Sequence, residues 1–449
     1  MKSFSYIPNT EQDRKRMLDF LGIESVDELF ADIPSSIRFN RELNIPAAWS
    51  EVELNRNMAR LAGKNANVDE YISFLGAGAY QHHIPAVVDA IISRSEFYTA
   101  YTPYQPEISQ GNLQAIFEFQ TMICELTGMD VSNASMYDGP TAMAEAGIMA
   151  CSATRRTKLL VSRAVHPEYR AVLNTYAYGQ KIEVVEVDIE NGLTDTKDFE
   201  AKLSDDVAGV IVQYPNFFGS IEDIQTYAEL AHAKKALFIA VVNPIALGIL
   251  EAPGALGADI VVGEGQSLGN PLSFGGPYLG FLATRTEHVR RIPGRVVGQT
   301  RDLDGRRAFV LTLQAREQHI RREKASSNIC SNQALNAIAA TVYMAYMGKE
   351  GFQEVAKLNL QKAHYAQKRL ASVKGVEPLF SAPFFNEFAL KLPVEPKTVN
   401  KELLAAGIIG GYDLGRDYPE YKDAMLFAVT EVRTKDDIDM LAERLEEMI

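Results

Sequence analysis

The sequence predicts an α/β protein, with a large domain on a mostly parallel sheet followed by a smaller C-terminal α+β domain. In the middle of the chain, short apolar runs alternate with helical patterns, as in parallel strands covered by helices on both faces. In the last third, helices and a few strands follow one another without that alternation. The length of 449 residues suits two or three domains of roughly 100–200 residues each.

We divide the chain into residues 1–70, an N-terminal helical arm; residues 71–325, the large domain; and residues 326–449, the small domain. In the arm, Asp13–Leu21 and Val26–Phe30 have helical spacing. Residues 71–110 read as a long loop rich in prolines and aromatics.

The large domain is predicted from apolar runs and amphipathic patterns, and the small domain from longer helices. The expected helices are 112–127, 141–154, 222–235, 331–347, 352–373 and 399–406, and a last helix capped by Thr434. The expected strands are 158–161, 182–187, 207–213, 237–242, 259–262, 279–283, 385–392 and 424–430.

Composition excludes several classes of protein. The net charge of −13 argues against a nucleic-acid partner, because binding phosphates requires a basic field. The three cysteines form no metal-binding or disulfide pattern, which favours the cytoplasm, and we expect no metal site. We find no secretory signal and no apolar run long enough for a membrane span.

A large α/β domain with a small domain after it is also the layout of fold-type-I enzymes that use pyridoxal phosphate (PLP), although this is an analogy of fold alone. Such a site needs a helix N-terminus for the phosphate and a ring to stack on the pyridine. Thr141, at the start of the 141–154 helix, is in the phosphate position. The preceding Asp138 opposes an anion there and reads better as a helix cap. His166 follows a strand and begins a helix, so it suits either stacking or capping.

The two remaining cofactor groups are missing. An aspartate should end the 237–242 strand and hold the pyridinium proton, but the chain has Asn243. A Schiff-base lysine should follow the next strand, where the chain has Ser267. No lysine occurs between Lys235 and Lys324, and a Schiff base requires a primary amine.

Three long motifs carry a family resemblance. They are residues 98–111 (YTAYTPYQPEISQG), residues 273–277 (SFGGP), and residues 293–298 (PGRVVG) leading to residues 312–330 (TLQAREQHIRREKASSNIC). The chain resembles the glycine cleavage system P-protein over essentially its whole length. The length, Asn243 and Ser267 resemble the lysine-lacking subunit of the split, two-subunit form.

The resemblance implies that PLP is bound to a lysine-bearing second subunit rather than to this chain. Together the two subunits would decarboxylate glycine and transfer the aminomethyl group to the lipoyl arm of H-protein. His166, Asn243, Ser267 and Thr141 would then line a vestigial pocket.

The Tyr98–Gln110 segment is our candidate for the part of this chain that reaches the partner's site. Tyr101 and Tyr104 would donate hydrogen bonds, Thr102 and Gln110 would add neutral polar groups, and Glu107 would orient a neighbour. The alternative is an aromatic packing loop.

A basic block stands out against the acidic chain. It is either a solvated helix face or a surface that docks anionic groups at the subunit interface. We disfavour its lysine as a displaced Schiff-base residue. The block consists of Arg316, His319, Arg321, Arg322 and Lys324.

Two other functions stay open from the sequence. One is a structural or regulatory pseudoenzyme that contributes no residue to any site. The other is a stand-alone PLP-dependent amino-acid lyase.

Overall fold

The computed structural model describes residues 6–39 and 41–449. The chain forms two units, Met1–Ala66 and Asn67–Ile449. The first contains α1 (Glu11–Leu21), η1 (Val26–Phe30) and α2 (Glu51–Ala62), none of which has a buried residue. The helix predicted at 13–21 is confirmed as α1, whereas 26–30 forms a 3₁₀ helix.

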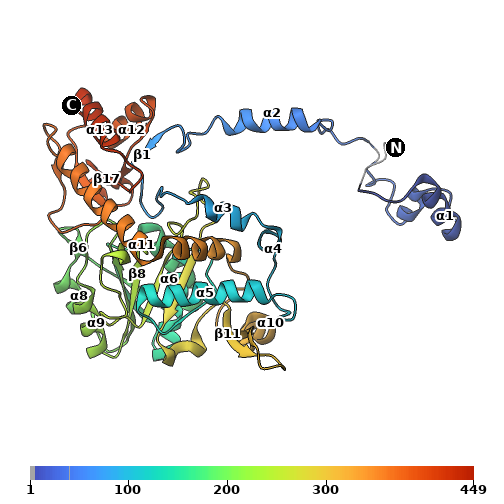
Figure 1. Ribbon diagram of the computed structural model, residues 1–449, viewed down its shortest axis with the longest axis horizontal. Coiled ribbons are helices and arrows are strands. Elements are labelled where there is room, and N and C mark those ends of the chain that lie inside the picture. Colours follow the sequence, from blue (N-terminus) through green and yellow to red (C-terminus); the bar gives the residue numbers. More distant parts are fainter. Residues whose placement is uncertain (1–5, 40) are drawn as a thin grey trace. The chain divides into compact units, whose positions relative to one another are not determined.

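The second unit is built on a seven-stranded sheet of order β2-β10-β9-β8-β7-β3-β4 (Figure 1). The strands β4, β3, β7, β8 and β9 run parallel, and β10 runs antiparallel to both of its neighbours. The mostly parallel sheet is therefore confirmed. The strand bounds are β2 (Val131–Ser132), β3 (Lys158–Ser162), β4 (Glu183–Val187), β7 (Val207–Tyr214), β8 (Leu237–Val242), β9 (Ile260–Glu264) and β10 (Gly280–Thr284).

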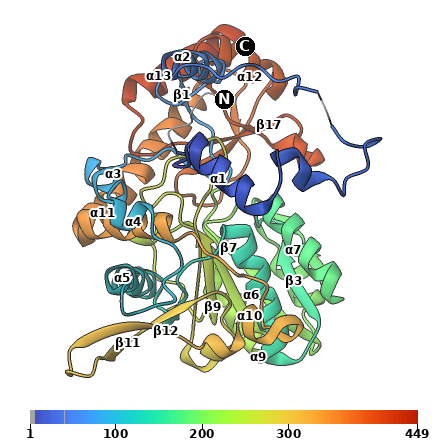
Figure 2. The same ribbon diagram turned by 90° about the vertical axis from the view of Figure 1, so that its right-hand side faces the viewer.

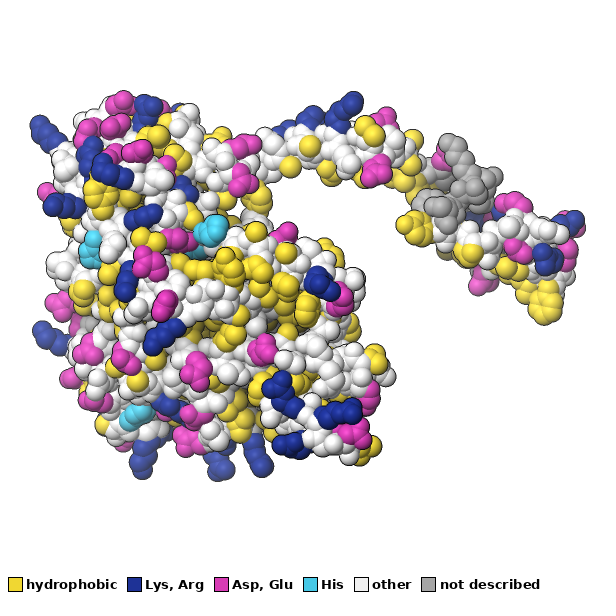
Figure 3. Space-filling model, viewed as in Figure 1, with side chains coloured by type: hydrophobic (Ala, Val, Ile, Leu, Met, Phe, Trp, Pro, Cys, Tyr) yellow, Lys and Arg dark blue, Asp and Glu magenta, His cyan; other side chains and the backbone are white. Residues whose placement is uncertain are grey.

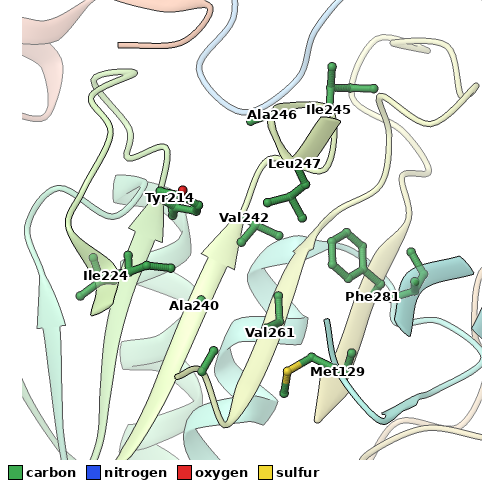
Figure 4. Packing of buried hydrophobic residues seen from close by; sticks show 14 of the residues in the cluster. Met129, Tyr214, Ile224, Ala240, Val242, Ile245, Ala246, Leu247, Val261 and Phe281 are labelled. Carbon is green, nitrogen blue, oxygen red and sulfur yellow. The ribbon is translucent and has the colours of Figure 1, made fainter. Parts of the chain in front are cut away.

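Helices cover both faces of this sheet. On β8, Phe238 and Val242 pack in the core cluster that contains residues of α5, α9 and α11, and Figure 4 shows part of this cluster around Val242. Ile239 and Val241 pack in the cluster of α6 and α7 on the other face. Burial on both faces explains why these strands are continuous apolar runs. The helix bounds are α5 (Gln110–Thr127), α6 (Gly139–Thr154), α7 (Pro167–Gln180), α9 (Ile224–Ala233) and α11 (Ala334–Leu370).

A four-stranded antiparallel sheet of order β13-β14-β17-β16 forms the C-terminal α+β part, at the top of Figure 2. The second half of α11 and the helices α12 and α13 pack on it. Its elements are β13 (Glu377–Pro378), β14 (Glu387–Lys391), α12 (Pro396–Ala405), β15 (Ile408–Ile409), β16 (Tyr412–Asp413), η6 (Leu414–Arg416), η7 (Pro419–Tyr421), β17 (Ala424–Ala428) and α13 (Lys435–Met448). The early strand β1 (Ile72–Ser73) pairs in parallel with β15.

The remaining elements connect these layers. They are α3 (Ala86–Ile92), α4 (Ser95–Tyr98), β5 (Ile189–Glu190), β6 (Leu193–Thr194), α8 (Thr196–Lys202), η2 (Ala246–Gly248), η3 (Thr286–Arg291), β11 (Val296–Arg301), β12 (Arg307–Thr312), η4 (Gln314–Arg316), α10 (Gln318–Arg321) and η5 (Arg322–Lys324). In the part of the chain that the structure describes, no helix is long and apolar enough to cross a bilayer.

One prediction for this unit needs correction. The segment 71–110 is not one long loop, because α3 and α4 lie within it. The two helices predicted at 331–347 and 352–373 are confirmed as the two parts of α11, which are separated by a kink at the non-helical Gly348, whose φ is 59°. The division of residues 71–449 at residue 325 stays a prediction.

Candidate functional site

A small cavity lies at the carboxyl ends of β7, β8 and β9. Its volume is about 30 Å³, which is room for one or two water molecules. The predicted residues His166, Asn243 and Ser267 line it, together with Gly78, Tyr80, Tyr169, Gln213, Val241, Val242, Pro244, Glu264 and Gln266. Thr141 does not line it.

The N-terminus of α6, which is the predicted phosphate position, is occupied by carboxylates of the chain itself. Gly139 N–H donates to Glu264 Oε2 at 2.9 Å. Thr141 N–H donates to Asp138 Oδ1 at 2.9 Å, which confirms Asp138 as the helix cap. Pro140 has no N–H, and Ala142 N–H donates to the Asp138 carbonyl at 3.1 Å. Every N–H of the first turn is therefore already used.

Glu264 lines the cavity and was not singled out from the sequence. It ends β9, and its Oε1 accepts hydrogen bonds from the backbone N–H groups of Gln266, at 3.0 Å, and Leu279, at 2.9 Å. Burial raises the pKa of this carboxyl to about 7, while the backbone donors favour its ionised form. A phosphate at this place would meet negative charge instead of free donors.

His166 is a capping residue of α7. Its Nδ1 accepts from Glu168 N–H at 3.1 Å and its Nε2 donates to the Ala77 carbonyl at 2.8 Å. Its ring stacks on Tyr169 with centroids 4.9 Å apart. Burial lowers the His166 pKa, so the neutral ring that this bonding requires is favoured. Of the two roles left open by the sequence, the structure places His166 in capping.

The pyridinium and lysine positions contain neutral side chains. Asn243 Oδ1 accepts from Ile245 N–H at 3.0 Å, closing a turn after β8. The Ser267 hydroxyl is buried and has no hydrogen-bond partner among residues 6–39 and 41–449. Lys324 lies on the exposed turn η5 and is not among the residues that line the cavity.

The segment Gly76–Tyr80 closes the cavity from the C-terminal part of the unit. Tyr80 OH donates to Glu387 Oε2 at 2.6 Å and Ala77 N–H donates to Glu387 Oε1 at 2.7 Å. The Gln266 side chain bonds Tyr80 N–H at 2.9 Å and the Tyr80 carbonyl at 3.0 Å. With this segment in place, the pocket does not fit pyridoxal phosphate.

The Tyr98–Gln110 segment forms a second candidate site. It connects α4 to α5, and Tyr101 within it is 79% exposed. Glu107 is exposed and Thr102 is half-buried. The exposed side chains are therefore aromatic and polar groups with space around them, as a surface that meets another chain requires.

The end of this segment is clamped to the β11–β12 hairpin. Gln110 Nε2 donates to the Phe309 carbonyl and Gln110 Oε1 accepts from Phe309 N–H, both at 2.9 Å. The same Nε2 donates to the Pro106 carbonyl at 2.7 Å. Gln110 is consequently an anchor of the segment within its own chain, rather than a free polar group.

Tyr104 connects the two predicted segments. Its hydroxyl accepts a hydrogen bond from Arg295 Nη2 at 2.9 Å, and its ring lies edge-on to His319 with centroids 6.3 Å apart. Arg295 is buried and was not predicted as a site residue, because no local pattern distinguishes a buried arginine from a solvated one.

The basic block divides into a half-buried and an exposed part. The Arg316 guanidinium bonds the carbonyls of Ile292 and Gly294, and burial lowers its pKa. The remaining cations His319, Arg321, Arg322 and Lys324 are exposed. Figure 3 shows Lys and Arg side chains gathered at the lower right of this unit, where Figure 1 has β11 and α10.

Comparison with known proteins agrees with this fold and these motifs. The profile of the family "Glycine cleavage system P-protein" matches residues 4–445. The "Probable glycine dehydrogenase (decarboxylating) subunit 1" of Moorella thermoacetica is 61% identical over 437 residues, covering 97% of this chain and 98% of that protein.

Two solved structures have a similar fold. A crystal structure of "glycine decarboxylase (P-protein) of the glycine cleavage system, in inhibitor-bound form" has a TM-score of 0.93 and 46% identity, covering 99% of this chain and 100% of that one. The sphingosine-1-phosphate lyase of Burkholderia pseudomallei has a TM-score of 0.66 at 14% identity, covering 92% and 94%. The predicted fold class, that of fold-type-I PLP enzymes, is confirmed.

Proposed function

Because the chain belongs to the glycine cleavage system P-protein family, we propose that it is subunit 1 of a two-subunit glycine decarboxylase. In this proposal a lysine-bearing subunit 2 binds PLP, and this chain binds none. The complex decarboxylates glycine and transfers the aminomethyl group to the lipoyl arm of H-protein. The complex acts in the cytoplasm, and three free cysteines, Cys124, Cys151 and Cys330, suit that compartment.

The hydrogen bond from Gly139 to Glu264 carries the cofactor assignment. Fold-type-I enzymes need a helix N-terminus for the phosphate, and here a carboxylate of the chain takes that place. Ser267 supplies no amine, and the cavity of about 30 Å³ is far smaller than the roughly 300–1,000 Å³ of ligand pockets. These features argue against a stand-alone PLP-dependent lyase.

Tyr101, Thr102, Tyr104 and Glu107 are the residues that we propose for the partner's site. Their segment is exposed, yet it is held at its middle by the hydrogen bond from Arg295 to Tyr104 and at its C-terminal end by the Gln110 clamp. An exposed segment that is fixed at these two points suits a wall that another chain completes. A pseudoenzyme scaffold would need no such exposed polar groups, and it is the competing function.

The test uses the chain alone and together with subunit 2. The purified chain, mixed with PLP and treated with borohydride, should yield no labelled peptide, while the co-expressed complex should yield one label on the subunit 2 lysine. A labelled peptide from this chain, at Lys324 or elsewhere, would contradict the cofactor assignment.

The contribution to the partner's site is tested separately. Tyr101→Phe and Glu107→Gln should lower turnover of glycine by the complex without changing the affinity between the subunits. Tyr178→Phe, at a 90% exposed tyrosine on α7, is the matched control. Unchanged turnover in every variant of the Tyr98–Gln110 segment would favour the scaffold.

A further inference from the structure

The side chain of Arg295 is a buried cation that contacts the side chain of Tyr104. It directly precedes β11, and only 4% of its surface is exposed. Its Nη2 donates to the Tyr104 hydroxyl at 2.9 Å, and its guanidinium carbon lies 5.3 Å from the centre of the same ring. The two groups therefore contact one another through both the ring and the hydroxyl.

No carboxylate of the described residues lies within hydrogen-bond distance of this arginine. Its ion-pair partner is Glu317, whose Oε2 lies 4.0 Å from Arg295 Nε. Within the described residues, Arg295 Nε and Nη1 have no hydrogen-bond partner. Burying a cation with one long ion pair and two unpartnered donor atoms is unfavourable, so stability is a weak reason for an arginine here. The only side-chain hydrogen bond that it makes in the described residues is the one to Tyr104.

The direction of that bond determines where the Tyr104 proton points. A guanidinium has donors only, so the phenol oxygen must be the acceptor. The hydroxyl hydrogen of Tyr104 is then left over, and within the described residues it has no acceptor. Tyr104 is 48% exposed, and His319 borders its ring. The free hydrogen is therefore available to an acceptor outside this chain.

We propose that Arg295 is a positioning residue that holds Tyr104 as a hydrogen-bond donor to an anionic oxygen in the partner subunit's site. This inference rests on the proposed function. The acceptor is a carboxylate or phosphate oxygen, supplied either by the substrate or by the cofactor on the partner. The nearby cation strengthens the donor, because it withdraws charge from the phenol oxygen.

Arginine suits this task better than lysine. Its planar guanidinium donates to the hydroxyl and lies over the ring at the same time. A lysine at position 295 retains the charge but offers no plane and no fixed second donor. Arg295→Lys should accordingly restore part of what Arg295→Met loses.

The experiment is a double-mutant cycle on the co-expressed complex, with Arg295→Met, Tyr104→Phe and both together. Each single variant should lower kcat/KM for glycine about 10- to 100-fold. The kcat/KM of the double variant should be no lower than that of the less active single variant, because the two residues act as one unit. A rise of KM for glycine would identify the substrate carboxylate as the acceptor. Faster loss of PLP on dialysis, with KM unchanged, would identify the phosphate.

Controls separate positioning from folding. The affinity between the two subunits, measured by biolayer interferometry, should change less than about threefold in Arg295→Met, Arg295→Lys and Tyr104→Phe. Arg285 has a partly buried guanidinium that bonds the carbonyls of Ala258 and Gly128. Arg285→Met should lower the melting temperature and leave kcat/KM unchanged.

Multiplicative losses in the double variant, or a loss in Arg295→Met that is confined to subunit affinity, would overturn the inference. So would a normal kcat/KM in Arg295→Met beside an impaired Tyr104→Phe, although the proposed function would survive that result. Full activity of both Tyr101→Phe and Tyr104→Phe would instead remove the proposed role of the whole segment. If Arg295→Met does not assemble with subunit 2, Arg295→Lys takes its place in the double-mutant cycle, and the same comparison of kcat/KM applies.

Discussion

The Glu264 carboxylate accepts a hydrogen bond from Gly139 N–H at 2.9 Å, at the residue where α6 begins. A helix N-terminus favours an anion, and the chain satisfies this preference with its own side chain. Ser267, at the position where a lysine was expected, and Glu264, which accepts the hydrogen bond at the start of α6, line the same pocket.

Restoring the lysine alone should not restore cofactor binding. In Ser267→Lys, the new amine faces a cavity of about 30 Å³, and the phosphate position still holds Glu264. We expect no visible absorbance band after incubation of this variant with PLP and no borohydride-trapped adduct. A stoichiometric adduct at position 267 would contradict the blocked phosphate position. Lys235, in the wild-type chain, serves as the reference for unspecific labelling.

Removing the Tyr80 hydroxyl should destabilise the chain. Tyr80 OH donates to Glu387 at 2.6 Å, and both side chains are buried. Tyr80→Phe leaves a buried carboxyl with one donor fewer, which should lower the free energy of unfolding by about 1–3 kcal/mol. Urea unfolding followed by circular dichroism measures the loss. Tyr178→Phe, at an exposed tyrosine, should have no effect, and an equal loss in both variants would refute the explanation.

The stability of the chain should fall as the pH rises through the acid range. Burial raises the pKa of Glu387 from 4.5 to about 7. Between these values the folded state retains a proton that the unfolded state has lost, so the free energy of unfolding decreases as the pH increases. The total decrease in the free energy of unfolding that Glu387 causes is roughly 3 kcal/mol, and this decrease is complete above the pKa of the folded state.

Glu387→Gln isolates this contribution, because the other buried carboxyls remain. Its free energy of unfolding should fall less steeply between pH 4.5 and 7 than that of the wild type. Glu377→Gln, at an exposed glutamate of β13, should retain the wild-type slope. Identical slopes in all three proteins would exclude Glu387 as the titrating group.

The strands of the large sheet could be predicted because they are buried on both faces. Leu237–Val242 was predicted residue for residue, since a continuous apolar run leaves little doubt about its limits. The β11–β12 hairpin was missed although Asp304-Gly305, a turn dipeptide, connects its strands. The strand β11 (VVGQTR) begins with only two consecutive apolar residues and ends in exposed polar ones, and the apolar run of β12 (RAFVLT) is shorter than that of β8, so the pattern marks their limits less clearly.

A missing functional group could be predicted from the sequence, whereas a contact between residues far apart in the chain could not. The absence of a lysine near Ser267 can be read directly from the sequence. The role of Glu264 depends on a contact with Gly139, which is 125 residues away in the chain. Arg295 and Tyr104 are separated by 191 residues, and only the folded chain brings them together.

Releasing the clamp at Gln110 should free the Tyr98–Gln110 segment. Gln110→Ala removes the two hydrogen bonds to Phe309 and the one to Pro106, while the core of α5 stays intact. We expect faster cleavage of the segment by chymotrypsin, whose sites include Tyr98 and Tyr101. Turnover of the complex should fall about tenfold, because a misplaced contact group loses its alignment.

The control for this variant is Gln114→Ala on the next turn of α5. In the part of the chain that the structure describes, the Gln114 side chain bonds only the exposed Glu118 on the same helix, at 2.8 Å, so its removal should change neither cleavage nor turnover. Protection of the segment against chymotrypsin when subunit 2 is added would place it at the interface. If chymotrypsin cleaves Gln110→Ala no faster than the wild type, the order of the segment does not depend on the clamp. That order must then come from the contact between Tyr104 and Arg295.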